Sequence, residues 1–193
     1  MLWETSDITD MAHAVCKIVW KPQDPSNSCH LWAPEIHYIN DKWYIYYAAD
    51  DGNTDNHQLY VLENSSPDPM EGKFEMKGSI ITKPEYEWER QWVNPDGSRT
   101  AYPIYVNEGP QFFHSKDNKT LILYYAASGS WSPYYCVGML TADAESDLLD
   151  PASWTKSSVP VFQQSLENEV YGPGGLSFVP SPDGTEWYMI CLL

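Results

Sequence analysis

Apolar and polar residues alternate in short runs along most of the chain, and runs with the three-to-four-residue spacing of an amphipathic helix are scarce. The short runs are rich in aromatic and β-branched residues, and turn formers such as Asn40-Asp41 and Pro182-Asp183-Gly184 separate them. Residues 142–149 alone have the pattern of a short helical turn. The sequence therefore predicts an all-β chain with strands at Lys42–Ala49, Gln58–Glu63, Lys73–Ile80, Gln111–His114, Thr120–Ala127, Tyr134–Leu140, Leu176–Val179 and Glu186–Leu192.

One arrangement of these runs occurs three times. Each unit begins with a proline, continues through a short strand and a polar turn, and ends in a longer aromatic strand; the prolines are Pro34, Pro110 and Pro173. Repeated units of this kind are typical of propeller blades, in which the first strand of each blade lines a central channel. A proline is tolerated before that strand because the innermost strand is the edge of its sheet.

The composition narrows the classes of partner. With 27 acidic and 11 basic side chains the net charge is −16, so neither nucleic acids nor anionic membranes are expected to bind. No apolar run approaches the roughly 20 residues of a membrane helix, and the first residues lack the pattern of a signal peptide. The 9 Trp, 14 Tyr and 5 Phe oppose disorder and suit a neutral polyhydroxyl ligand, whose apolar ring faces stack on aromatic side chains.

Two carboxyl groups are candidates for chemistry. Glu35 and Glu108 stand near the beginning of the first strand in two units, so we expect them at equivalent places facing the channel. Carboxyl groups that face each other across a channel can share glycoside hydrolysis, one as acid and one as base. The alternative is that both are ordinary polar residues at strand starts. Trp32 is either a platform on which a sugar stacks or a part of the core.

The cysteines and histidines show no metal-binding spacing. The cysteines lie far apart without a Cys-x-x-Cys pair, so scattered buried thiols are expected rather than two disulfides. The histidines are spaced like structural or surface residues, and neither a metal nor a cofactor is predicted. These residues are Cys16, Cys29, Cys136 and Cys191, and His13, His30, His37, His57 and His114.

Three segments resemble glycoside hydrolase family 43. The segment His30–Ile39 with Lys42–Ala49 resembles the second blade of that family. Two later parts of the family are matched in the same order. The first resembles Asn107–Pro110 with the strand pair that follows it, and the second resembles Tyr171–Pro173 with Ser181–Trp187. The likeness is to fungal and bacterial members described as arabinofuranosidases or arabinanases, and it covers nearly the whole chain.

The resemblance implies a fold and a function. The fold is a partial five-bladed β-propeller, expected as one incomplete domain over residues 1–193. The implied function is inverting hydrolysis of arabinose- or xylose-containing plant polysaccharides, with an oligo- or polysaccharide as the partner. Glu108 matches the Glu of the family's Glu-Gly-Pro motif and by resemblance inherits the role of general acid, which needs a carboxyl that stays protonated near neutral pH. Trp32 and Glu35 are assigned to substrate binding.

The chain departs from the family pattern in three places. The family's general-base Asp has no match before Trp32, because Asp24-Pro25 lies too close to it and is expected to be a loop turn. Lys77–Ile80 continues directly into Ile81–Arg90, so a blade carrying the second family Asp is expected to be missing there. Gly175 stands where the family often has a His near the funnel centre.

These departures leave rival functions open. One is an arabinosidase-type hydrolase with impaired activity, and another is a non-catalytic propeller that binds carbohydrate. A third is a translation product without a function. Because an acid without a base cannot activate water for an inverting displacement, weak or absent turnover is expected. The localisation stays undetermined, since family members are often secreted while this sequence shows no signal peptide.

Overall fold

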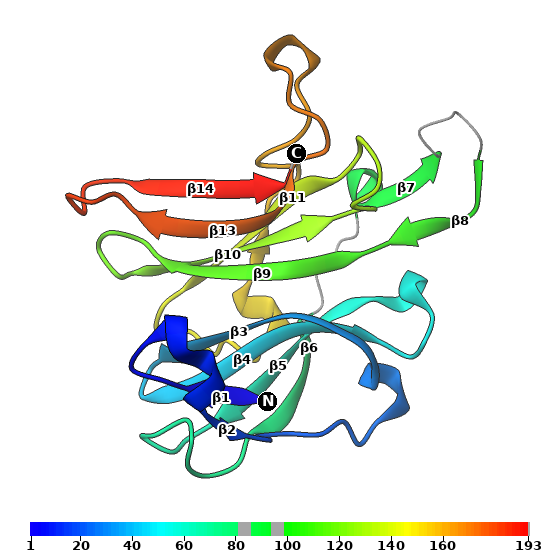
Figure 1. Cartoon of the computed structure of the whole chain (residues 1–193). Helices are drawn as coiled ribbons and strands as arrows, with labels where there is room; N and C mark the ends of the chain where they lie inside the picture. Colours follow the sequence, from blue (N-terminus) through cyan, green and yellow to red (C-terminus); the bar gives the residue numbers. More distant parts are fainter. Residues whose placement is uncertain (81–85, 94–98, 193) are drawn as a thin grey trace.

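The computed structural model describes residues 1–80, 86–93 and 99–192 (Figure 1). These residues form antiparallel sheets joined by loops and short 3-10 turns, which confirms the all-β prediction. In this part of the chain no helix is long and apolar enough to cross a membrane. The 3-10 turns are η1 (Ile8–His13), η2 (Pro25–Asn27), η3 (Thr54–Asn56), η4 (Glu87–Glu89), η5 (Pro151–Ser153) and η6 (Leu166–Asn168).

Two four-stranded sheets and one two-stranded sheet have the arrangement of propeller blades, each starting with its innermost strand. Blade A consists of β3 (Cys29–Ile39), β4 (Lys42–Asp50), β5 (Gln58–Asn64) and β6 (Glu75–Ile80). Blade B consists of β9 (Asn107–His114), β10 (Thr120–Ala127), β11 (Cys136–Asp143) and β12 (Thr155–Lys156). Half-blade C consists of β13 (Gly174–Pro180) and β14 (Trp187–Leu192). Two further pairs are β1 (Leu2–Glu4) with β2 (Val15–Lys17), and β7 (Arg90–Val93) with β8 (Arg99–Tyr105).

Blade A packs directly against blade B. Their facing sides form one hydrophobic core, in which the ring of Tyr46 on β4 stacks on Phe112 of β9 with 5.4 Å between centroids. In the turn after β3, Asn40 Nδ2 donates to the carbonyl of Ala144, which follows β11, at 3.0 Å. This hydrogen bond also joins the two blades. In Figure 1 the inner strands β3 and β9 run side by side. The channel-lining strands of the two blades are therefore neighbours.

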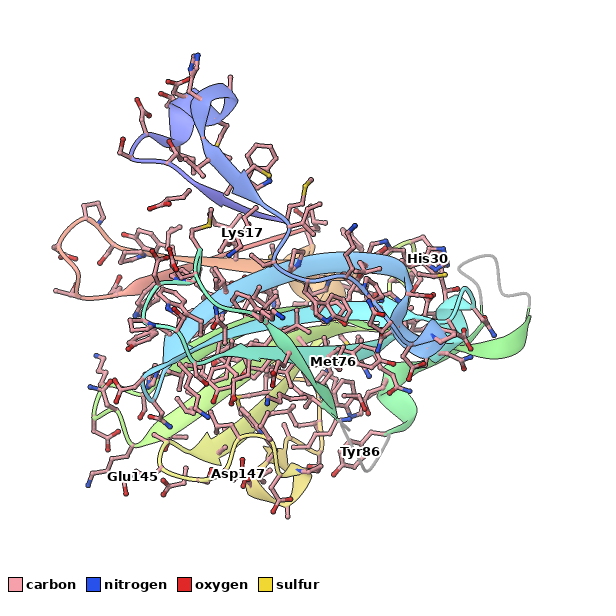
Figure 2. The ribbon with its side chains drawn as sticks, turned by 90° about the horizontal axis from the view of Figure 1, so that it is seen from below. Lys17, His30, Met76, Tyr86, Glu145 and Asp147 are labelled. Atoms are coloured by element: carbon pink, nitrogen blue, oxygen red, sulfur yellow. The ribbon has the colours of Figure 1, made fainter. Side chains whose placement is uncertain are left out.

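The opposite face of blade A is covered by the N-terminal part of the chain. Tyr47, Tyr60 and Leu62 form a second core cluster against which Val19 and Trp20 pack. The hairpin of β1 and β2 itself stands away from the body, beyond Lys17 in Figure 2. The N-terminal segment thus protects one face of blade A through its later residues rather than through its strands.

The segment that leads from blade A to blade B is held by a buried ion pair. Glu89, at the end of η4, pairs with Lys156 of β12, and the two side chains are only 3% and 2% exposed. The same carboxyl accepts hydrogen bonds from the Tyr125 hydroxyl at 2.9 Å and from the backbone N–H of Tyr86 at 2.8 Å. Residues 81–85 of the expected linker lie outside the described residues.

Two expectations need correction. Residues 142–149 form no helical turn: β11 continues to Asp143, and the carboxyls of Asp143 and Asp147 then accept from the backbone N–H groups two residues later, which makes turns. All four cysteines are free, which confirms thiols over disulfides, but only Cys136 is buried. Cys16 is exposed, because the hairpin that carries it stands clear of the core.

Candidate functional site

Each innermost strand has a bulge at the same level, where two residues oppose a single residue of the next strand. The first residue of each bulge has a positive φ of 44°, 57° or 57°. Glycine adopts this conformation without strain, which explains the Gly-Pro sequence in β9. The bulges are Ala33-Pro34 opposite Tyr47, Gly109-Pro110 opposite Tyr125, and Gly175-Leu176 opposite Cys191.

The bulges decide which residues share a level around the channel. The residues before the bulge are Trp32, Glu108 and Gly174, and those after it are Glu35, Gln111 and Ser177. The expectation that Glu35 and Glu108 are equivalent is therefore wrong, because they stand on opposite sides of the bulge. Pro34 and Pro110 are equivalent, but the counterpart of Pro110 in the third unit is Leu176 and not the expected Pro173.

Trp32 lies partly open to solvent, with 38% of the residue exposed, so the alternative that it belongs to the core is wrong. Its indole is flanked by two imidazoles, with ring centroids 4.4 Å away for His57 and 5.6 Å away for His30. It also lines a cavity of about 230 Å³ with residues from the N-terminal segment. An aromatic ring held between fixed neighbours and open on one side is suited to stacking against an apolar ligand face.

Asp50, at the end of β4, fixes both imidazoles. Its buried carboxyl lies 2.7 Å from Nδ1 of His57 and 2.8 Å from Nδ1 of His30, and it accepts from the backbone N–H of Gly52 at 2.8 Å. Burial by itself would raise the pKa of Asp50, but these hydrogen bonds outweigh it and hold the pKa below its usual value. The side chain therefore stays a carboxylate that accepts from both rings. His30, labelled in Figure 2, lies at the beginning of β3.

Glu35 is engaged by neighbours on both of its oxygens. Oε2 lies 3.0 Å from His37 Nε2, and Oε1 accepts a hydrogen bond from Gln111 Nε2 across the junction of blades A and B. Glu35, His37 and Gln111 line a cavity of about 640 Å³ together with Phe113, Phe178 and Trp187. This cavity runs along the inner strands and combines aromatic faces with hydrogen-bonding groups.

Glu108 lies on β9, opposite Ala126, and is half-buried. Its Oε1 accepts a hydrogen bond from the hydroxyl of Tyr135 at 2.8 Å. Tyr135 belongs to the loop between β10 and β11, and its ring is buried beside Gly174 of half-blade C. The structure thus brings Glu108 to the same level as Trp32, whereas Glu35 belongs to the next level.

The remaining expectations about the site concern turns and metals. Asp24-Pro25 forms the turn expected of it, because the Asp24 carboxyl accepts from the backbone N–H of Ser26 at the start of η2. Among the described residues, no group of three or more His, Cys, Asp or Glu side chains could hold a metal ion. Gly175 is the bulge residue of β13, with φ of 57°.

A family model described as Glycosyl hydrolases family 43 matches residues 1–97 and residues 86–193. The chain belongs to this family. The two matched ranges meet and overlap at residues 86–97, next to the junction at which a blade is expected to be missing. The absence of an internal blade at this junction stays a prediction from the sequence.

The chain is similar in sequence to curated arabinofuranosidases. It is 32% identical to the extracellular exo-alpha-(1->5)-L-arabinofuranosidase of Streptomyces chartreusis, with 90% of this chain and 66% of the relative covered. It is 27% identical to alpha-L-arabinofuranosidase B of Pyricularia oryzae, with 93% and 46% covered. The first alignment extends over 219 positions, more than the 193 residues of this chain, so the relative has residues that this chain lacks. The chain spans between 41% and 66% of the length of these curated relatives.

Solved structures show the same fold at low sequence identity. The alpha-L-arabinanase of Cellvibrio cellulosa complexed with arabinohexaose is 13% identical with a TM-score of 0.54, covering 82% of this chain and 43% of that one. The GH43_1 enzyme from Xanthomonas citri is 15% identical with a TM-score of 0.51, covering 86% and 41%. The fold of this chain is a partial five-bladed β-propeller.

Sequence reasoning missed the residues that support the candidate site. His57, Gln111 and Tyr135 contact the candidate residues, and Asp50 holds His57 in place, but none of them was assigned to the site from the sequence. Gln111 could have been found by aligning the central strands of blades A and B, which place it at the level of Glu35. Tyr135 lies in a loop and gives no periodic signal.

Proposed function

We propose that this chain binds arabinose- or xylose-containing oligosaccharides at the level of Trp32 and Glu108, with Glu108 as the general acid of an inverting hydrolysis. The observation that carries the proposal is the place of Glu108: it stands directly before the Gly-Pro bulge of an inner strand, level with a partly exposed indole. Sugar recognition commonly combines an aromatic face with fixed hydrogen-bonding groups.

The roles follow from the chemistry of the side chains. Trp32 offers its open face to the apolar side of a sugar ring, and Glu108 donates a proton to the glycosidic oxygen as the bond to the anomeric carbon breaks. A water that attacks the opposite face of that carbon must give up its own proton to a base. Glu35, with Gln111 and His37, supplies hydrogen bonds to hydroxyl groups further along the channel.

Hydrolysis is tested with purified chain on aryl arabinofuranoside and aryl xyloside substrates. Release of the aryl group that disappears in Glu108→Gln supports the general-acid role, because the amide keeps the shape of the side chain but cannot supply the proton. Glu145→Gln, an exposed substitution of the same kind in the turn after β11, is the matched control and is expected to leave turnover unchanged. Turnover that survives Glu108→Gln contradicts the role of Glu108.

A second candidate function is non-catalytic carbohydrate binding. The observation that favours it is the engagement of Glu35, whose two carboxyl oxygens are taken up by Gln111 and His37. Titration with arabino- and xylo-oligosaccharides, followed by heat release and by the fluorescence of the chain, separates the candidates. Binding without turnover, weakened by Trp32→Ala, supports this second function.

A further inference from the structure

We propose that Tyr135 is the positioning residue of Glu108, and that position 174 requires a glycine because the ring of Tyr135 packs there. The inference rests on Glu108 being the acid of the proposed function. Trp32 and Glu108 present side chains at the same level of blades A and B, and the third residue at that level, Gly174, has none. The ring of Tyr135, which comes from blade B, fills this place.

The fit between Tyr135 and half-blade C is close. A Cβ atom at residue 174 would lie 2.0 Å from Cε1 of Tyr135, which no real side chain could tolerate. Gly172, with φ of 54°, makes the same allowance for the loop backbone, because a Cβ there would lie 2.5 Å from the carbonyl oxygen of Ser132. In the same loop, the backbone N–H of Tyr135 donates to that carbonyl oxygen at 3.2 Å. Gly172 therefore leaves room for the loop backbone, and Gly174 leaves room for the Tyr135 ring.

The hydroxyl group is oriented toward Glu108. It donates to Glu108 Oε1 at 2.8 Å, and its own oxygen accepts from the backbone N–H of Gly175. Burial raises the pKa of Tyr135, and the neighbouring Glu108 carboxylate raises it further, so the hydroxyl keeps its proton and remains a donor. Burial also raises the pKa of the adjacent Cys136 thiol to about 12. This thiol therefore stays protonated and adds no charge beside Tyr135 and Glu108.

A hydrogen bond from a permanent donor fixes the rotamer of a carboxyl group, so that its other oxygen points in one direction. Removing the Tyr135 hydroxyl should therefore loosen the Glu108 side chain. A tyrosine that only packs would affect stability, and the loss of its hydroxyl would leave the order of the Glu108 side chain unchanged.

The test measures the mobility of the Glu108 side chain by nuclear magnetic resonance relaxation, at one fixed pH, in chain carrying carbon-13 in its glutamate side chains. The Glu108 signal is the one that is absent in Glu108→Gln. In Tyr135→Phe we expect the order parameter of this side chain to fall toward that of the exposed Glu145. Tyr134→Phe is the matched control, because Tyr134 is exposed and adjacent, and it should leave the order parameter of Glu108 unchanged.

Gly174→Ala gives an independent arm, because its Cβ would displace the Tyr135 ring. The order parameter of Glu108 should fall as in Tyr135→Phe if the variant folds, as checked by circular dichroism; if it does not fold, Tyr135→Phe alone decides. An unchanged order parameter in Tyr135→Phe overturns the positioning role, and an unchanged order parameter in folded Gly174→Ala overturns the requirement for glycine at position 174. Because the signal is read without substrate, these outcomes are separate from the failure of hydrolysis.

Discussion

Glu35 of β3 and Gln111 of β9 share one level of the channel, and the Gln111 side chain donates a hydrogen bond to the Glu35 carboxyl. The contact crosses the junction between blades A and B. Residues at the same level in neighbouring blades meet here because the two inner strands are adjacent. The bond therefore reports on the direct packing of the two blades as well as on the candidate binding groups.

Gln111→Ala is expected to lower the free energy of unfolding by about 1–3 kcal/mol, because a partly buried carboxyl loses a hydrogen-bond donor. Chemical denaturation measures the change. Gln23→Ala, the same substitution at an exposed loop position, should stay within about 0.5 kcal/mol of the parent chain. Equal stability of the two variants would show that the contact between the blades contributes nothing.

The Asp50 carboxyl predicts an acid-sensitive part of the stability. A carboxyl whose pKa is lowered by folding stabilises the folded state above its unfolded-state pKa of about 3.9, and this contribution is lost as the pH falls through the folded-state value. The unfolding free energy should therefore decline below about pH 4. Asp50→Asn should lower it by roughly 1–3 kcal/mol at neutral pH and flatten the decline.

Urea denaturation between neutral pH and acid measures this dependence. Asp41→Asn is the control, since Asp41 is exposed in the turn after β3 with φ of 62°, a conformation that asparagine adopts readily. A pH profile of Asp50→Asn parallel to that of the parent chain would contradict the assignment of the acid-sensitive contribution to Asp50.

The buried pair of Glu89 and Lys156 predicts strong coupling. Lys156→Met should destabilise the chain by about 3–5 kcal/mol, because Glu89 would remain charged and buried without its partner. Combining it with Glu89→Gln should recover part of this loss, since the buried charge is then removed. Lys116→Met, at an exposed turn, is the control. Additive effects of the two substitutions in a double-mutant cycle would mean that the ion pair contributes no coupling.

The sequence was sufficient for the strands and insufficient for the register. Alternating aromatic runs predicted β4, β5 and β10 nearly to the residue, because the strand period is a local property. The start of β9 was placed four residues late, since Gly109-Pro110 looks like a turn but forms a bulge through which pairing continues to Asn107. Because pairing continues through the bulges, Glu108 lies before the bulge of β9 whereas Glu35 lies after the bulge of β3, so the two are not at one level.

The contacts that support the site could not be predicted from the sequence because they join residues of different strands and loops. His57 and Asp50 meet across η3, and Tyr135 reaches Glu108 only because half-blade C offers glycine at residue 174. Such contacts depend on how blades and loops pack, and no periodicity records them. The family motif nevertheless singled out Glu108, since a Glu-Gly-Pro sequence combines a carboxyl with the bulge that fixes it.

The last prediction concerns turnover. We expect this 193-residue chain to hydrolyse aryl arabinofuranosides at least about 1,000-fold more slowly than the Streptomyces chartreusis arabinofuranosidase, because removing one member of a cooperating catalytic set commonly costs on the order of 10³–10⁶ in rate. The family resemblance leaves the general-base and orienting Asp residues without an expected match, and Glu35 is held by Gln111 and His37. Side-by-side assays at equal enzyme concentration measure the ratio.

Restoration sharpens this prediction. A chain that receives, between Ile80 and Tyr86, the residues that the relative has in addition should gain rate if they form the expected blade and supply a catalytic carboxyl, whereas a Gly-Ser insert of the same length should not. Glu108→Gln in the restored chain must abolish the gain, since the added carboxyl works only with the acid. Should the original chain already turn over within about 10-fold of the relative, another of its carboxyls activates the water, and it would have to lie roughly 6.5–9.5 Å from that of Glu108.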